Sequence, residues 1–175
     1  MLFKLKTYIQ FLSKASNQHG VHSPFVYHLV TLCFYKNIPE ESPYLSLAQA
    51  PLSKKRNALF LKTLTYFQPS RVLLIGKEAA KQQVFPVLKD PTYTCVYFTK
   101  DLTANTVWQQ FKQHEKQATT HHFLLIEGIH STREKQAVWQ AITQQPKATV
   151  TIDMYQQGLV FFRPSQEKEH FTIRV

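Results

Sequence analysis

A short apolar run at residues 71–76 (RVLLIG) constrains the fold of this chain more than any other stretch. It follows Pro69-Ser70, ends at Gly76 and precedes the residues KEAAK, which favour a helix. A buried strand that turns through a glycine into a helix is typical of parallel sheets covered by helices. In doubly wound α/β sheets, nucleotide-like cofactors bind beside the turn after the first strand. The first question is therefore whether the turn at Gly76 can hold a cofactor.

The chain is long enough for one domain with its own hydrophobic core. Its 175 residues are 43% hydrophobic and 18% charged, which argues against global disorder. Cys33 and Cys95 lie in apolar segments, so we expect two reduced, buried thiols in a cytoplasmic protein. Lysines interrupt the apolar residues at the start of the chain, and we expect neither a signal peptide nor a membrane span.

Positive charge predominates, with a formal net charge of +10. Such a balance favours acidic partners such as nucleic acid or an anionic membrane. The basic residues are nevertheless spread along the chain, and the densest cluster, at residues 54–56, is only three residues long. A basic nucleic-acid-binding domain is therefore a hypothesis that the charge supports but no recognition motif does.

The first sixteen residues predict an amphipathic helix, because Leu2, Leu5, Ile9 and Leu12 recur at helical spacing with lysines outside this face. We expect this apolar face to pack onto the domain. The alternative is a helix that lies on a membrane surface.

A second helix is expected after Ser23-Pro24, a favourable cap followed by proline at the first helical position. Three histidines lie nearby, at positions 19, 22 and 28, but neither a cysteine nor a carboxylate completes a ligand set. We therefore predict no metal site, and interpret His22 as part of a loop that faces the ligand. Residues 1–56 would form an N-terminal helical segment and linker, and residues 57–175 the main domain, in one compact unit.

The main domain alternates between helices and strands. We expect a helix that ends before Pro69, the strand at 71–76, a helix containing Val84, Phe85 and Leu88, and a strand at 93–98. A helix capped by Asp101 or Thr103, a strand at 123–126 and a helix capped by Ser131 follow. Residues 149–155, 159–163 and 170–175 alternate like antiparallel strands, with a turn at Gly158. The pattern predicts an α/β layered domain with an antiparallel edge, whose last strand offers a free edge for dimerisation.

Two stretches resemble a bacterial family of class I S-adenosylmethionine-dependent methyltransferases. They are residues 17–26 (NQHGVHSPFV) and residues 126–175, which end in VTIDMYQQGLVFFRPSQEKEHFTIRV. Residues 50–76 match more loosely but in the same order. The resemblance implies a Rossmann-like three-layer sandwich with S-adenosylmethionine as cofactor. It places the cofactor against Gly76 and Lys77, with Asp101 reaching the ribose, His22 closing over the site, and Glu127 and His130 as catalytic base or orienting residue.

This chain departs from the family pattern at the cofactor site. Leu74 stands where the family has an acidic residue, and Gly76 is the one glycine of the turn that is kept. Lys100 occupies the position of the acidic residue that would bind the ribose, and only Asp101, one residue later, could replace it. Glu127-Gly128 stands where relatives carry two aspartates, and residues 98–123 leave room for only one helix and one strand. The sheet should therefore be contracted by at least one parallel strand.

Three functions remain open. The first is a pseudoenzyme that kept the scaffold, weakened or lost the cofactor site and became a binding or partner module. The second is an active methyltransferase on a small-molecule acceptor, because positioning and one proton acceptor can suffice for methyl transfer. The third is the basic nucleic-acid-binding domain.

Overall fold

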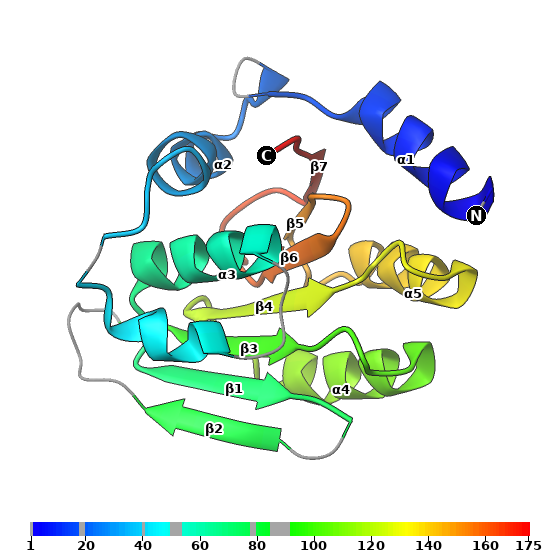
Figure 1. The fold of residues 1–175 in the computed structure, drawn as a ribbon. Coiled ribbons are helices and arrows are strands. Elements are labelled where there is room, and N and C mark those ends of the chain that lie inside the picture. The colour runs from blue at the N-terminus through cyan, green and yellow to red at the C-terminus, as the bar shows by residue number, and fades with distance from the viewer. Residues whose placement is uncertain (1, 18–19, 40, 50–53, 78–79, 85–91) are drawn as a thin grey trace.

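A computed structural model describes residues 2–17, 20–39, 41–49, 54–77, 80–84 and 92–175. Seven strands form one mixed sheet, in the order β2-β1-β3-β4-β6-β5-β7. Helices cover both of its faces (Figure 1). The expected α/β architecture is confirmed, and it is compatible with a Rossmann-like sandwich.

The elements follow the chain closely. The helical ones are α1 (Leu2–Lys14), α2 (Pro24–Leu29), the π-helical turn η2 (Val30–Phe34), the 3₁₀ helix η3 (Pro43–Gln49), α3 (Lys54–Phe67), α4 (Ala104–Gln117) and α5 (Arg133–Thr143). The strands are β1 (Arg71–Ile75), β2 (Ala80–Val84), β3 (Thr94–Phe98), β4 (His122–Glu127), β5 (Val150–Asp153), β6 (Gln157–Phe161) and β7 (Glu169–Thr172).

Two hydrophobic layers hold the sheet, because side chains alternate between its faces. On one face Tyr97 and Leu125 pack with residues of α2, η2 and α3. On the other, Phe98 and Ile126 pack with residues of α4 and α5. Both cysteines are free and buried, as the sequence predicts.

The segment after Gly76 is a strand where a helix was predicted. Residues 80–84 form β2, which pairs antiparallel with β1 from Ile75↔Ala80 to Arg71↔Val84. The sequence AAKQQ favours a helix locally, but the open edge of β1 offers a row of backbone hydrogen bonds that overrides this weak preference. Phe85 and Leu88, the other core residues of the predicted helix, lie outside the described residues.

The position of β3 matters for the cofactor hypothesis. In a Rossmann sheet of order 3-2-1-4-5-6, the second strand lies beside the first on the side away from the fourth. Here β3, the next parallel strand after β1, lies between β1 and β4. In the described part of the chain, the other side of β1 carries the antiparallel β2 instead. β3 therefore occupies the place of the fourth Rossmann strand, and the place of the second has no parallel strand.

The C-terminal hairpin of β5 and β6 is antiparallel, as predicted, but two details of this region were predicted wrongly. β7 runs parallel to β5, because residues 162–168 cross back before the last strand begins. The turn between β5 and β6 contains Tyr155, with φ +66°, and Gly158 lies inside β6. A Cβ at Gly158 would come within 2.6 Å of the Trp139 ring, so this glycine makes room for α5.

The first helix exists as predicted but packs through a different face. Thr7 and Phe11 are its buried residues, whereas Leu2, Leu5 and Ile9 are exposed. After α1, the chain forms a parallel bridge from Ser16 to Ile173, so part of the outer edge of β7 is already paired. No helix in the described part of the chain is long and apolar enough to cross a membrane.

The cap of α5 is one residue later than predicted. Thr132 is the N-cap, and its hydroxyl accepts a 3.2 Å hydrogen bond from the Lys135 N–H. Ser131 instead lies against Gly128, whose φ is +67°. The prediction failed because Ser-Thr offers two adjacent capping residues, and only the loop geometry selects one of them.

Candidate functional site: the carboxyl edge of the sheet

The parallel strands β1, β3, β4 and β5 end at one edge of the sheet, where ligands of α/β proteins usually bind. Figure 1 shows β1, β3 and β4 pointing toward the same end of the molecule. Three groups of polar side chains lie along this edge. They belong to the turn at Gly76, to the end of β4, and to the end of β5.

At the first group, the turn after β1 is closed by a side chain of the protein itself. The backbone N–H of Lys77 donates a 2.7 Å hydrogen bond to Oδ2 of Asp101. Oδ1 of Asp101 accepts a short hydrogen bond from the Thr99 hydroxyl, which also lies 3.0 Å from the Ile75 carbonyl oxygen. The hydrogen bonds from Thr99 and from the Lys77 N–H lower the pKa of Asp101. The carboxylate is therefore ionised at neutral pH and bound to this turn.

These contacts do not fit an adenosylmethionine cofactor. A cofactor at such a turn needs backbone N–H groups and open space at the glycine. The Lys77 N–H is already bound to Asp101, and the Asp101 carboxylate lies within ordinary contact distance of the space beside Gly76. Lys135 also donates a 2.6 Å hydrogen bond to the Lys100 carbonyl and so ties α5 to the same loop. The residues that would hold the cofactor hold one another instead.

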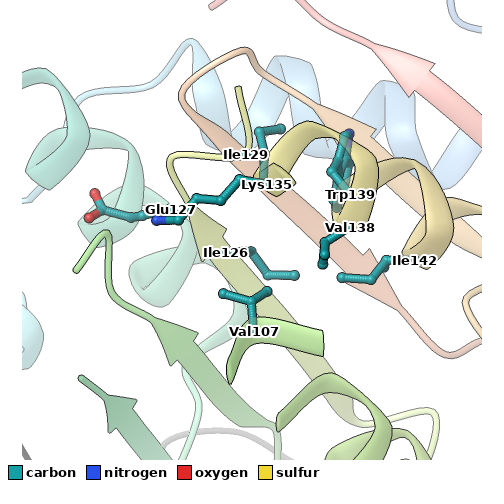
Figure 2. Close-up of a pocket in the computed structure, with 8 residues that line it drawn as sticks. All are labelled: Val107, Ile126, Glu127, Ile129, Lys135, Val138, Trp139 and Ile142. Atoms are coloured by element: carbon teal, nitrogen blue, oxygen red, sulfur yellow. The ribbon is translucent and has the colours of Figure 1, made fainter. Parts of the chain in front are cut away.

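At the second group, Glu127 ends β4 and is only 1% exposed. Its Oε1 accepts a 3.4 Å hydrogen bond from the Gln157 side chain. Figure 2 shows Lys135 extending from α5 toward Glu127 beside a small apolar pocket. Burial lowers the pKa of Lys135, and the carboxylates of Asp101 and Glu127 oppose this effect. The pocket holds about 10 Å³, roughly the space of one water molecule, so no organic substrate reaches Glu127 through it.

The third group is centred on Asp153, the last residue of β5. Its Oδ2 lies 2.7 Å from His130 Nε2 and accepts a 3.1 Å hydrogen bond from the Trp139 indole N–H. Its Oδ1 accepts a 2.8 Å hydrogen bond from the Tyr155 N–H. The Tyr155 ring stacks on His130 with the ring centres 5.3 Å apart. We call these four residues the Asp153 cluster.

The Asp153 cluster resembles a catalytic His–Asp pair but leaves the histidine covered. When Nε2 donates to the carboxylate, Nδ1 is the atom that could accept a proton from a substrate. In the described structure that Nδ1 is buried and has no hydrogen-bond partner. The pair therefore holds the loop after β4 against β5, and it does not present an accessible base.

A groove of about 730 Å³ runs between α1 and α5, with His130 and Asp153 in its wall. This volume is within the range of small-molecule sites. Most of its lining groups are neutral hydrogen-bonding side chains, which include Thr7, Gln10, Ser13, Gln136, Gln140, Thr143, Gln144 and Thr172. We call it the α1–α5 groove. A second groove of about 420 Å³ lies on the other side of α1, between Tyr8, Lys62 and Arg174.

The structure brings together some of the predicted site residues and separates others. Gly76, Lys77 and Asp101 are in mutual contact, and Glu127 and His130 follow on the same edge. His22 does not join them, because its neighbours Ser23 and Phe25 contact Gln166 and Phe161, beyond and at the end of β6. Since β6 is antiparallel to β4, those contacts lie at the opposite edge of the sheet. His22 is exposed there.

Sequence reasoning missed Asp153, Trp139 and Tyr155 as partners of His130. A signal was present, because Asp153 follows the β-forming residues VTI and precedes a turn, as carboxylates at strand ends often do. Among the described residues, no three histidine, cysteine or acidic side chains lie close enough to hold a metal ion.

We compared the chain with protein-family models, with curated proteins and with solved structures, and none of them matches it.

Proposed function

We propose that this protein is a binding module on a methyltransferase-like scaffold, a pseudoenzyme that does not take S-adenosylmethionine at its first turn. One observation carries the proposal: the Asp101 carboxylate occupies the Lys77 N–H at 2.7 Å, where a cofactor would have to bind. The antiparallel β2 beside β1 supports it, because the parallel strand that would supply a ribose-binding carboxylate is replaced.

The two candidate bases support the same conclusion. Glu127 is buried against Gln157, and the free nitrogen of His130 is buried beneath Tyr155. A general base must come within hydrogen-bond reach of the proton that it removes. Neither side chain can do so without a rearrangement of the edge, so a binding role needs fewer changes than catalysis.

Titration with S-adenosylmethionine and S-adenosylhomocysteine tests the proposal. We expect no rise in the melting temperature of the wild-type protein and no heat of binding up to about 1 mM ligand, because a ligand in excess of its Kd must stabilise the folded state. A saturable rise of several degrees would overturn the proposal in favour of an active methyltransferase.

The Asp101→Ala variant shows whether the carboxylate is the cause. Glu167→Ala is the matched control, since Glu167 is an exposed carboxylate distant from this turn in sequence. If Asp101 alone closes the site, Asp101→Ala should gain weak binding and Glu167→Ala should not. If neither binds, the rearranged strands and not the carboxylate exclude the cofactor.

The α1–α5 groove is the surface on which we propose that a polar small molecule binds. A thermal-shift screen of a small-molecule library would find candidates. Ala141→Trp should abolish their effect, because Ala141 lines the groove. Ala137→Trp lies on the exposed part of α5 and should leave the hits unchanged. Hits that survive Ala141→Trp would place the ligand elsewhere.

A further inference from the structure

The exposed side of α1 carries a continuous aliphatic face. Leu2, Leu5, Ile9 and Leu12 are 84%, 58%, 58% and 38% exposed. Their spacing places them within about one quarter of the helix circumference, because successive residues are rotated by about 100°. We call these four residues the α1 stripe. A patch of this kind on a small protein marks an interaction surface.

The packing of α1 explains why the stripe faces outward. On the opposite side of the helix Phe11 lies 5.4 Å from the Tyr155 ring, and the Tyr155 hydroxyl donates a 2.8 Å hydrogen bond to the Lys4 carbonyl. Figure 1 shows α1 at the outside of the fold, above α5 and beside β7. The helix is thus fixed by one face, and its other apolar face remains exposed.

Charge distinguishes between the occupants that could cover this stripe. The helix contains Lys4, Lys6 and Lys14, all exposed, and no acidic residue. Arg133 adds a further cation, 5.7 Å from the centre of the Phe3 ring. A second copy of this chain would bring the same lysines and another net charge of +10, which opposes self-association. An anionic surface is complementary to both the charge and the stripe.

We propose that α1 is an interfacial helix that docks the protein onto the surface of an anionic lipid bilayer. The four aliphatic side chains enter the boundary between headgroups and acyl chains, as in other amphipathic surface helices. Lys6 lies beside the stripe, and the long lysine side chains extend toward the lipid phosphates. The domain stays outside the bilayer, with the α1–α5 groove next to its surface. This proposal is independent of whether the turn at Gly76 takes a cofactor.

Co-sedimentation of the full chain with vesicles tests the proposal. Phosphatidylcholine vesicles that contain about one third phosphatidylglycerol should bind the protein at least ten-fold more strongly than pure phosphatidylcholine vesicles, because each basic residue near an anionic surface adds several-fold. Raising the salt from about 0.1 M to about 0.5 M should weaken the binding, because the charges are then screened.

Paired variants separate the stripe from the charge. Leu5→Gln/Ile9→Gln should lose at least ten-fold in binding, and Lys4→Gln/Lys6→Gln should lose most of the preference for anionic vesicles. Tyr27→Gln/Leu32→Gln is the matched control, since these residues are 44% and 52% exposed on α2 and η2. It should bind like the wild type. Unchanged melting temperatures would confirm that the variants are folded.

Three results would overturn the proposal. The first is binding of Leu5→Gln/Ile9→Gln at the wild-type level. The second is equal binding of the wild type to neutral and anionic vesicles. The third is no vesicle binding together with a concentration-dependent dimer that Leu5→Gln/Ile9→Gln dissociates, which would assign the stripe to a second copy of this chain.

Discussion

The backbone N–H of Tyr155 donates a 2.8 Å hydrogen bond to Oδ1 of Asp153, two residues earlier in the chain. This bond holds Tyr155 at φ +66°, a conformation that costs free energy for a residue with a bulky side chain. The ring is thereby placed between His130 and α1. One carboxylate thus fixes the loop after β4 through His130, α5 through Trp139, and the first helix through Tyr155.

Replacing Asp153 should destabilise the protein strongly. Asp153→Ala leaves the Trp139 and Tyr155 N–H groups without their acceptor in a buried place, and each such group costs about 1–3 kcal/mol. We expect a total loss of about 2–4 kcal/mol in the free energy of unfolding, measured by urea denaturation. Asp153→Asn keeps an acceptor oxygen and should cost less. A loss below about 0.5 kcal/mol in Asp153→Ala would show that the cluster is not structural.

Gly158→Ala tests the packing of α5 on the sheet. The new methyl group would stand 2.6 Å from two atoms of the Trp139 ring, so the helix or the strand must move. We expect a loss of about 2–3 kcal/mol in the free energy of unfolding. Gly76→Ala is the comparison, because its methyl group would meet only the Thr99 hydroxyl oxygen, at 3.3 Å. It should cost less than half as much, and equal losses would contradict the assigned contact.

Gln68→Gly should stabilise the protein. Gln68 follows the last residue of α3 at φ +49°, and its N–H donates to the Leu64 carbonyl. Glycine adopts this left-handed conformation without the clash of a Cβ, which is why it commonly ends helices. We expect a gain of about 0.5–1 kcal/mol in thermal or chemical denaturation. Gln68→Ala keeps the Cβ and should give no gain, so similar values for the two variants would refute this explanation.

Acidification should destabilise the protein through His122. Its Nδ1 accepts a 3.1 Å hydrogen bond from the Thr119 N–H, and burial followed by the nearby His121 lowers its pKa below 6.5. The unfolded chain therefore takes up the proton first, so this contribution to stability is complete above pH 6.5 and decreases as the pH falls below it. His122→Asn, which keeps an acceptor, should flatten the decrease between pH 7.5 and pH 5.5 in urea denaturation. An unchanged slope would exclude His122 as its source.

The elements that the sequence predicted well are those whose hydrophobic pattern agrees with their final packing. β1, β3 and β4 are short apolar runs, and they lie buried between two layers of helices. α4 and α5 have strong helical periodicity, and each buries that face. In these cases local preference and tertiary burial favour the same structure.

The wrong predictions concern relationships between distant segments. β2 became a strand because β1 had a free edge, which no local pattern records. The helix periodicity of α1 showed two apolar sides but not that Tyr155 would select the side with Phe11. The direction of β7 depends on where residues 162–168 cross.

The candidate site was located correctly as an edge of the sheet, but its internal contacts were not foreseen. Asp101 was expected to reach a ribose, and it reaches Lys77 instead. Glu127 and His130 were expected to face a substrate, and both are covered by neighbours that sequence spacing did not bring together. Side-chain pairing across strands depends on the register and order of the sheet, which become known only from the structure.

The bridge between Ser16 and Ile173 protects an edge that would otherwise be reactive. The Ser16 N–H donates to the Thr172 carbonyl, and the Arg174 N–H lies 3.3 Å from the Ser16 carbonyl. A chain truncated to begin at residue 17 would uncover these backbone groups on the outermost strand. Unpaired outer strands recruit strands of other molecules. Such a truncated chain should therefore be prone to form insoluble aggregates, even if its interior folds normally.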